Sequence, residues 1–272
     1  MDKIIIEPIT SMKNAFSVAG QNVVITGGNR GLGRGIAQAF AECGANVAIL
    51  CRNEASGNEA AEQLRLLGSR ALAVKCDVGD FDSVLRAKEV VAREFDHIDT
   101  LVNNAGIDGK HGVFDDARLE EVKRVMNVNL DGVAAMIQVF GQWMMDEGRG
   151  GEIINISSIG GQAIGDPRAH PMPSYNASKA ALDHLTRHLS IVMGDYGIRV
   201  NAIAPGPTHS DLDAGLPPSI TQFIDETMPM HRFGEPLEIG ALAVFLASPA
   251  AAQITGVVAN HDGGTMCVGL TF

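Results

Sequence analysis

The sequence has few cysteines, no excess of positive charge and no long hydrophobic run, and each of these absences excludes a class of protein. Its four cysteines lie far apart and form no C-x-x-C pair: Cys43, Cys51, Cys76 and Cys267. This spacing suggests neither a disulfide framework nor a thiolate zinc site. Acidic residues outnumber basic ones by 32 to 21, the net charge is −11, and no basic run occurs. Because phosphate affinity comes mainly from clustered Lys and Arg, nucleic acid is not an expected partner.

Membrane insertion and secretion are not expected either. No run of about 18 apolar residues is present to span a bilayer. The N-terminal stretch MDKIIIEPITSMKN carries charged residues within its short apolar patch and lacks a small-residue cleavage site, unlike a secretory signal. With 46% apolar and 19% charged residues, the 272-residue chain is not of the disordered type. We therefore expect a soluble, cytoplasmic protein with a full hydrophobic core.

After residues 1–20, which we expect to form an N-terminal tail, short β-branched runs alternate with segments of helical spacing. The predicted strands are Asn22–Thr26, Asn46–Cys51, Ala71–Lys75, Thr100–Asn103, Glu152–Asn155, Arg199–Ala204 and Gly256–Asn260. The predicted helices are Leu32–Cys43, Ala55–Leu67, Ser83–Phe95, Glu120–Met145, Ser174–Met193 and Leu237–Leu246. A loop containing Pro205, Pro207, Pro217 and Pro218 is expected before the last helix.

Strands that alternate with helices must pair in parallel, because each helix returns the chain to the same end of the sheet. Residues 21–272 are therefore predicted to form a single Rossmann-like α/β domain, a doubly wound parallel sheet with helices on both faces. In such a sheet, ligands bind at the carboxyl ends of the strands.

A glycine-rich segment, Thr26–Gly33 (TGGNRGLG), joins the first strand to the first helix. Its glycines permit a tight turn and a close approach of backbone to ligand, and the helix N-terminus offers free N–H groups to a pyrophosphate. Such a turn can also exist for conformational reasons alone. Its position between a strand and a helix favours a dinucleotide site.

The spacing T-G-x-x-x-G-x-G resembles that of the short-chain dehydrogenase/reductase family, and three further motifs resemble the same family. They are Asn103–Gly106 (NNAG), Tyr175–Lys179 (YNASK, of the form Y-x-x-x-K), and Ile198–Asn201 (IRVN) with the Pro205-Gly206 pair. The likeness runs from Ser17 to Gly264, with the motifs in the family's order. It implies a nicotinamide dinucleotide cofactor and the interconversion of a ketone and a secondary alcohol by hydride transfer.

The resemblance implies a set of cofactor-binding residues: Gly27, Asn29, Arg30, Gly31, Leu32, Gly33, Arg52, Asp77, Val78, Asn104, Ala105, Gly106, Tyr175, Lys179, Pro205, Gly206 and Thr208. Asp77 and Val78 resemble the pair that contacts adenine, although Asp77 could instead only cap a turn. Ser210 is the alternative to Thr208 for contact with the carboxamide.

The preference for NAD or NADP depends on the charge of the residues at the end of the second strand. In the family, an acid that accepts a hydrogen bond from the ribose 2′-OH of NAD would fall at Cys51, which carries no charge. Arg52 follows it, and together with Arg30 it could bracket the 2′-phosphate of NADP. We therefore expect NADP(H) rather than NAD(H). The alternatives are that Arg52 is a solvated loop residue, and that Glu54 reaches the ribose, which would favour NAD.

Tyr175 and Lys179 are four residues apart, so on a helix they lie on one face. A neighbouring ammonium lowers the pKa of a phenol, ordinarily about 10, which would let Tyr175 act as general acid in reduction and general base in oxidation. The resemblance completes the catalytic set with Ser158, which would orient the substrate oxygen, and Asn129, which would hold a water behind Lys179. Ser157 is the alternative to Ser158, and Asn127 to Asn129.

One departure from the family bears on the substrate. Tyr175 lies 17 residues after Ser158 (175 minus 158), a longer gap than is common, and the extra length falls in Gly160–Pro173. Ser174–Thr186 (SYNASKAALDHLT) resembles members that act on sugars and polyols, while 3-oxoacyl thioester and hydroxysteroid members have similar motifs. Two alternatives stay open: an NAD-dependent alcohol dehydrogenase of the same family, and a non-catalytic protein that senses the cofactor.

Other features are expected to be structural. His184 and His188 have the spacing of a zinc helix, but no accompanying Glu or third ligand is evident, so no metal is expected. His170 is either a solvated loop residue or a substrate contact. Three methionines are read as packing in the core or between subunits: Met136, Met144 and Met145. The family resemblance and the apolar C-terminal end imply a homo-oligomer, a dimer or tetramer.

Overall fold

The computed structural model describes residues 3–110, 112–164, 172–210 and 218–268. Within these ranges, seven strands form one fully parallel sheet in the order β3-β2-β1-β4-β5-β6-β7. Strand order reverses between β1 and β4, which makes the carboxyl ends of these two strands the switch point of a doubly wound sheet. The predicted fold class is confirmed.

The strands lie where the alternation predicted them. Their bounds are β1 Asn22–Thr26, β2 Asn46–Cys51, β3 Ala71–Lys75, β4 Thr100–Asn103, β5 Gly151–Ile156, β6 Ile198–Pro205 and β7 Val258–His261. The first four have the predicted bounds, and the other three differ by one or two residues at their ends. In β1, β4 and β6 every residue is buried, as in a parallel sheet covered on both faces.

The predicted helices are also present. Five of them are α1 Gly31–Glu42, α2 Glu54–Leu66, α3 Phe81–Glu94, α8 Pro173–Gly194 and α10 Pro236–Ala247. The sixth is continuous but changes its winding, through α5 Leu119–Met126, η1 Asn127–Asp131, α6 Gly132–Met136, η2 Ile137–Gly141 and α7 Gln142–Glu147. The two η segments are π-helical turns, which in helices are often found at functional sites.

One prediction about this part of the chain is wrong. The proline-rich segment before α10 is not loop throughout, because it contains the helix α9, Pro218–Glu226. Proline breaks the interior of a helix but is compatible with its first turn, where Pro218 lies. Phe223 and Ile224 of this helix pack with Met228 in a small apolar cluster of their own. Shorter helical turns are α4 Val113–Asp116, η3 Ile159–Gly161, η5 Pro249–Ala251 and α11 Thr265–Val268.

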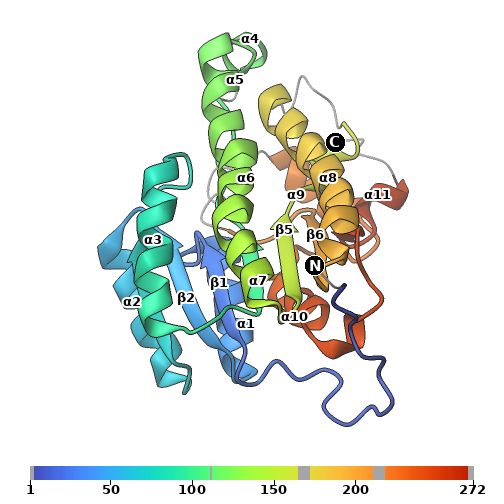
Figure 1. Ribbon diagram of the computed structural model, residues 1–272. Coiled ribbons are helices and arrows are strands. Elements are labelled where there is room, and N and C mark those ends of the chain that lie inside the picture. Colours follow the sequence, from blue (N-terminus) through green and yellow to red (C-terminus); the bar gives the residue numbers. More distant parts are fainter. Residues whose placement is uncertain (1–2, 111, 165–171, 211–217, 269–272) are drawn as a thin grey trace.

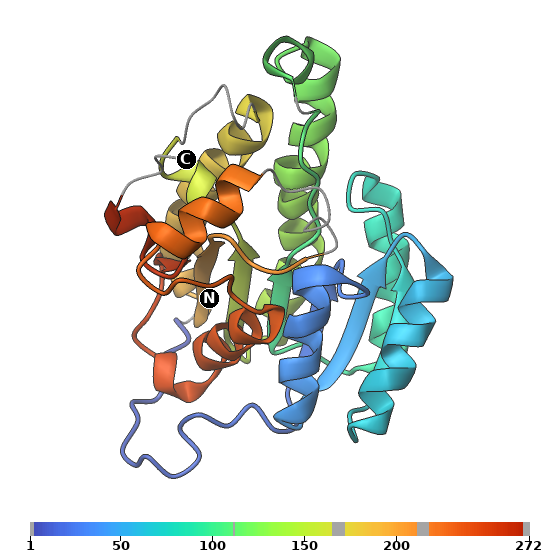
Figure 2. The same cartoon turned by 180° about the vertical axis from the view of Figure 1, so that it is seen from behind.

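The helices cover the sheet on both faces, with a hydrophobic core in each layer. On one face α3, the α5–α7 helix and α8 pack through residues such as Phe140, Met144 and Leu182 (Figure 1). On the other, α1 and α10 pack through Phe40 and Ile239 (Figure 2). Met136 and Met144 are core residues within one chain, and Met145 packs against the same core.

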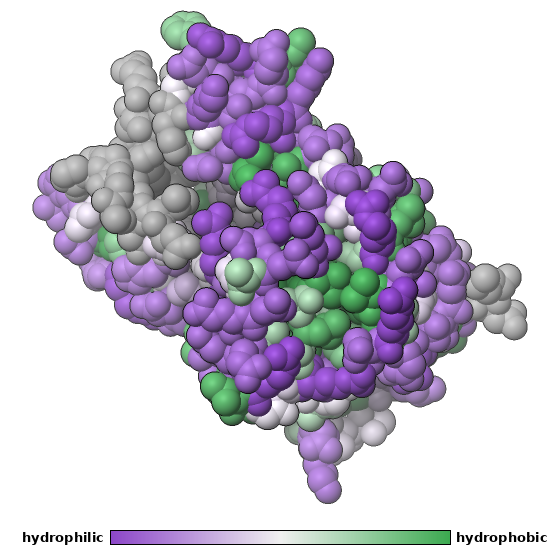
Figure 3. All heavy atoms as spheres, turned by 90° about the vertical axis from the view of Figure 1, so that its left-hand side faces the viewer, coloured by the Kyte–Doolittle hydropathy of each residue, from purple (hydrophilic) through white to green (hydrophobic). Residues whose placement is uncertain are grey.

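Residues 3–20 contain no helix or strand but contact the domain. Ala15 and Val18 are buried, the Ala250 N–H donates to Ala15 O at 2.7 Å, and Phe16 stacks on Phe245 with ring centroids 6.2 Å apart. In the described ranges, we find no helix both long and apolar enough to cross a membrane. The face that carries α2 and α3 is largely hydrophilic around an apolar patch (Figure 3), and α3 exposes Phe81, Leu85 and Val90.

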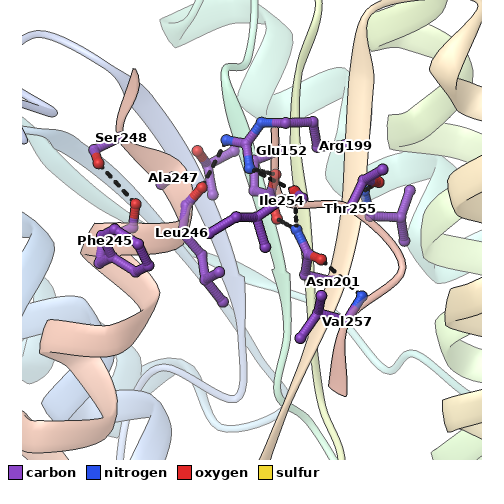
Figure 4. A network of polar contacts seen from close by, with 12 residues as sticks. Glu152, Arg199, Asn201, Phe245, Leu246, Ala247, Ser248, Ile254, Thr255 and Val257 are labelled. Atoms are coloured by element: carbon purple, nitrogen blue, oxygen red, sulfur yellow. Dashed lines mark hydrogen bonds and ion pairs between the residues drawn. The ribbon is translucent and has the colours of Figure 1, made fainter. Parts of the chain in front are cut away.

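A buried ion pair lies at the amino ends of β5 and β6, opposite the edge where ligands bind. Glu152 and Arg199 face each other across the two strands, with Glu152 Oε2 2.8 Å from Arg199 Nη1 (Figure 4). Asn201 donates to Glu152 Oε1 at 3.0 Å, and Arg199 donates to the carbonyls of Leu246 and Ile254 at 2.6 and 3.1 Å. The network thus binds the end of α10 and the segment before β7 to the sheet.

Candidate active site

The glycine-rich turn after β1 has the geometry that an anion site requires. Gly27 and Gly31 have φ of +67° and +52°, values that side chains rarely permit. A Cβ on Gly33 would collide with the Gly27 backbone and with Asn104. At Gly31, in contrast, a Cβ would meet nothing within 4 Å, so the first turn of α1 borders open space.

The N-terminus of α1 is available to a negatively charged group. Arg30, its N-cap residue, makes no capping hydrogen bond with its side chain, and the first turn contains no acidic residue. The first-turn N–H groups and the positive end of the helix dipole therefore face the space beside Gly31. These residues fit the pyrophosphate of a dinucleotide.

Thr26 and Asn104 lock the turn to the loop that follows β4. The Thr26 hydroxyl accepts from the N–H groups of Asn104 and Ala105 at 3.0 and 2.9 Å. In return, Asn104 Nδ2 donates to Thr26 O at 2.9 Å. The segment Asn104–Gly106 is thereby fixed beside the glycine turn, as its predicted role in cofactor binding requires. Asn29 lies on the other side of the turn and donates to Ser56 of α2 at 2.9 Å.

At the carboxyl end of β2, the buried Cys51 is followed by exposed residues that are candidate cofactor ligands. Cys51 is buried and its thiol donates to Asn53 O at 3.2 Å, while burial raises its pKa. Arg52 is exposed at the carboxyl end of the strand, and so is Arg30 in the glycine turn. Glu54, the alternative ribose ligand, forms an exposed ion pair with Lys75 at 3.4 Å.

After β3, Asp77 takes part in a turn at the carboxyl end of the strand. Its carboxylate accepts from the Gly79 N–H at 3.0 Å, so it does cap a turn, while Val78 is buried beneath it. This leaves Asp77 exposed at the same edge of the sheet as Arg52.

Tyr175 and Lys179 lie on the first turns of α8 and face the end of β5. Lys179 is 4% exposed, its ammonium donates to Ile156 O at 2.7 Å, and it lies 5.6 Å from the centroid of the Tyr175 ring. Burial lowers the pKa of Lys179 to about 8, opposed by the charge of Asp183. Burial raises the pKa of Tyr175, and a hydrogen bond with Ser158 opposes this shift.

The two serines after β5 point in different directions. Ser158 is half-buried, accepts from the Gly160 N–H at 3.1 Å, and lies close enough to Tyr175 to oppose the rise in its pKa. Ser157 is buried and donates to the backbone carbonyl of Lys179 at 3.4 Å. The geometry therefore favours Ser158 over Ser157 as the hydroxyl that faces a substrate beside Tyr175.

Asn129 and Asn127 are likewise distinguished by their surroundings. Asn129, within the π-helical turn η1, is fully buried and donates to Ile107 O at 2.8 Å and to Ser178 Oγ at 3.0 Å. Its Oδ1 accepts from the Ile107 N–H at 2.9 Å. Asn127 is exposed and donates to Gly79 O, away from α8. A Cβ on Gly106 would lie 3.4 Å from Asn129 Oδ1 and 3.6 Å from Lys179 Nζ, so Gly106 borders both groups.

The remaining predicted residues lie on neighbouring loops. Pro205 ends β6, and Gly206 packs against Asp262. Thr208 donates to Gly206 O at 3.0 Å, and Ser210 lines a pocket of about 530 Å³ with Gly31. His184 and His188 are exposed on α8, and His170 lies outside the described residues.

Asp116, which no sequence pattern indicated, holds the start of the helix that carries Tyr175. It is fully buried, and its carboxylate accepts from both the N–H and the hydroxyl of Ser174, each at 2.8 Å. Gly109 packs directly against this carboxylate, with no room for a side chain. Asp116 thus connects the loop after β4 to the residue that precedes Tyr175.

We expect Asp116→Ala to lower the free energy of unfolding by about 2 kcal/mol, since two hydrogen bonds to a buried charge are lost. It should also lower kcat more than it changes cofactor affinity, because the first turn of α8 is released. Urea unfolding and cofactor titration would measure both effects. Asp116→Asn retains an acceptor for the Ser174 N–H and should lie between wild type and the alanine variant; equal losses for both variants would contradict this role.

A glycine-rich anion cradle and a Tyr–Lys–Ser group thus meet at one edge of a doubly wound sheet, an arrangement typical of Rossmann-type oxidoreductases. A family model described as enoyl-(acyl carrier protein) reductase matches residues 27–266. The chain belongs to the short-chain dehydrogenase/reductase family.

Three of its relatives are informative. The chain is 36% identical to a galactitol 2-dehydrogenase of Rhizobium johnstonii, over 94% of this chain and 99% of the relative. It is 34% identical to an L-rhamnose 1-dehydrogenase (NAD(P)(+)) of a Sphingomonas species, over 90% and 96% of the two chains. A solved structure of 7α-hydroxysteroid dehydrogenase, complexed with NADH and 7-oxo glycochenodeoxycholic acid, matches with a TM-score of 0.87 at 31% identity, covering 94% and 98%.

Proposed function

We propose that the protein is an NADP(H)-dependent dehydrogenase/reductase that interconverts a secondary alcohol and a ketone, with Tyr175 as general acid and base. The observation that carries this proposal is the position of Tyr175: it lies beside the buried Lys179, with Ser158 close enough to oppose the rise that burial causes in its pKa. When bound, the nicotinamide ring supplies or accepts the hydride.

The residues of the chain then handle the substrate oxygen and its proton. In reduction, the carbonyl oxygen accepts hydrogen bonds from Tyr175 Oη and Ser158 Oγ, which orients the carbonyl carbon. Tyr175 Oη gives its proton to the oxygen as the alcohol forms, and takes it back in oxidation. The Lys179 ammonium stabilises the phenolate that this transfer leaves, through the low dielectric of the buried site.

The preference for NADP(H) is argued from charge at the edge of β2. Arg52 and Arg30 are exposed there, and the residue that precedes Arg52, at the end of the strand, is the buried, uncharged Cys51. A 2′-phosphate gains charge-assisted hydrogen bonds from guanidinium groups. Glu54 lies near the same edge, but its pairing with Lys75 reduces its repulsion of a phosphate.

Fluorescence titration with NADPH and NADH tests the cofactor proposal. We expect tighter binding of NADPH, and we expect Arg52→Asp to weaken NADPH binding by about tenfold to a hundredfold while changing NADH binding little. Arg93→Asp makes the same charge change at the opposite edge of the sheet, where α3 ends, and should leave the preference unchanged. If Arg52→Asp leaves the ratio of the NADPH and NADH affinities unchanged, Glu54 is favoured as the ribose ligand and NAD as the cofactor.

We further propose a sugar or polyol as the substrate. The support is the resemblance of Ser174–Thr186 to sugar-acting members, and the names of the relatives, which include galactitol and L-rhamnose dehydrogenases. Hydroxysteroids and 3-oxoacyl thioesters are the rival classes. A panel of hexitols, aldoses, hydroxysteroids and acetoacetyl thioesters, followed by NADP(H) absorbance, would separate them. Cofactor binding without turnover on every class would instead support a cofactor-sensing protein.

A further inference from the structure

Asp183 is a buried acid next to the candidate active site that the proposed mechanism does not use. It lies on α8 four residues after Lys179, so the two side chains are neighbours on one face of the helix. It is 3% exposed. Neither of its carboxylate oxygens has a hydrogen bond of good geometry among the described residues. An unsatisfied buried carboxylate is costly, and its presence calls for a physical explanation.

The observed hydrogen bond of Lys179, in turn, does not balance its positive charge. Its ammonium is buried, and the hydrogen bond observed for it in the described structure is to a neutral carbonyl, that of Ile156. A buried cation needs a counter-charge if it is to stay protonated. Asp183 acts on Lys179 in this direction: its negative charge raises the pKa of Lys179, which burial lowers to about 8.

The other charged groups on the elements packed against α8 are engaged elsewhere or exposed. Arg199 of β6 is paired with Glu152, and Glu121 of α5 with Arg124. Asp116 of α4 binds Ser174, at the start of the helix.

On the remaining elements that contact α8, Asp131 of η1 is exposed and η3 carries no titratable group. The groups that act on Asp183 itself include the hydroxyl of Ser157, the residue that follows β5. On α8 itself, the exposed Arg187 follows Asp183 by one turn. Burial raises the pKa of Asp183, while Ser157, Arg187 and Lys179 oppose the rise.

We propose that Asp183 is a positioning residue whose carboxylate supplies the counter-charge that keeps the Lys179 ammonium protonated inside the protein. The ammonium can then act on Tyr175 as a cation. Only this catalytic consequence rests on the proposed function, because the coupling of the two charges is independent of the substrate.

The direct test is an NMR titration of protein labelled with ¹³C at lysine Cε, with the Lys179 signal assigned by its loss in Lys179→Met. Asp183→Asn keeps the size of the side chain and removes its charge. We expect it to lower the pKa of Lys179 by about one unit or more. Glu152→Gln neutralises another buried acid, at the amino end of β5, whereas Lys179 bonds to Ile156 at the carboxyl end of that strand. It should therefore leave the Lys179 titration in place. An unchanged Lys179 pKa in Asp183→Asn overturns the proposal.

A reciprocal measurement keeps the test valid if Asp183→Asn does not fold. Coupling between two sites is mutual, so Lys179→Met should raise the pKa of Asp183, followed by its carboxyl ¹³C signal, by an equal amount. Asp183→Ser provides a second neutral variant. No change of the Asp183 pKa in Lys179→Met also overturns the proposal.

The catalytic consequence is a shift in the pH profile. In ketone reduction the rate should fall as pH rises through the Lys179 pKa, because the cation that stabilises the Tyr175 phenolate is lost. Asp183→Asn should move this basic limb to lower pH, by the same amount as the NMR shift. If wild type turns over no carbonyl substrate, the proposed function fails while the NMR test still decides the charge coupling. If wild type is active and the basic limb of the pH profile does not move in Asp183→Asn, the role of Asp183 is wrong while the proposed function stands.

Discussion

Replacing Tyr175 by Phe should lower kcat by about 10²–10⁴-fold, the contribution typical of a positioned general acid or base. The change removes one oxygen and leaves the ring beside Lys179, where the ammonium lies 5.6 Å from the ring centroid. The cradle around Gly27 and Gly31 is untouched, so the affinity for NADPH should stay within a few-fold of wild type. Steady-state reduction of a polyol-derived ketone, together with NADPH fluorescence titration, would measure both.

The chain provides a matched control, because it has two tyrosines. Tyr196 is half-buried after the end of α8 and packs against the core on that side of the sheet. Tyr196→Phe removes the same oxygen at a distance from the site and should leave kcat nearly unchanged. Substantial turnover by Tyr175→Phe would remove the general acid role from this residue. Equal losses in both variants would indicate a structural effect.

The sequence was sufficient to predict the elements that carry strong periodicity. Each of the first four strands is a short apolar run bounded by turn residues, and each has its predicted bounds. Once the sheet is parallel, the ends of β1, β4 and β5 must share an edge, so the glycine turn, Asn104 and Ser158 were predictable as neighbours. Their meeting follows from topology rather than from any local signal.

The sequence could not predict which individual charged side chains are buried. Asp116, Glu152 and Asp183 look like ordinary surface acids in a chain of net charge −11, yet each is buried. Their environments depend on residues far away in the chain: Ser174 for Asp116, and Arg199 and Asn201 for Glu152. Contacts of this kind arise from tertiary packing and leave no periodicity to read.

The same limit explains the distinction between neighbouring candidates. Ser157 and Ser158 are chemically identical, and only the course of the chain after β5 turns one toward Lys179 O and the other toward Tyr175. Asn127 and Asn129 lie two residues apart on one helix, so they face different directions, and the packing of Ile107 and Ser178 determines which one is buried. α9 was missed because Pro217 and Pro218 suggested a loop, although proline at the start of a helix is compatible with its geometry.

Glu152→Ala should lower the free energy of unfolding by about 3–5 kcal/mol, the largest stability effect we expect from a single substitution. Glu152 is 1% exposed and Arg199 8%, so removing the carboxylate leaves a guanidinium buried without its counter-charge. Asn201 Nδ2 also loses one of its two acceptors and keeps Ile254 O. Urea unfolding would measure the loss, and the kcat of the folded protein should not change, because the network lies at the amino ends of β5 and β6.

A double-mutant cycle identifies the origin of this loss. If the cost of Glu152→Ala is mainly that of an unpaired buried cation, adding Arg199→Met should recover part of the stability, since a neutral apolar side chain needs no partner. Glu152→Gln, which keeps an acceptor for Asn201, should cost less than the alanine variant. Purely additive losses in the double variant would show instead that Arg199 contributes mainly through its bonds to Leu246 and Ile254, which hold the end of α10 and the approach to β7 against the sheet.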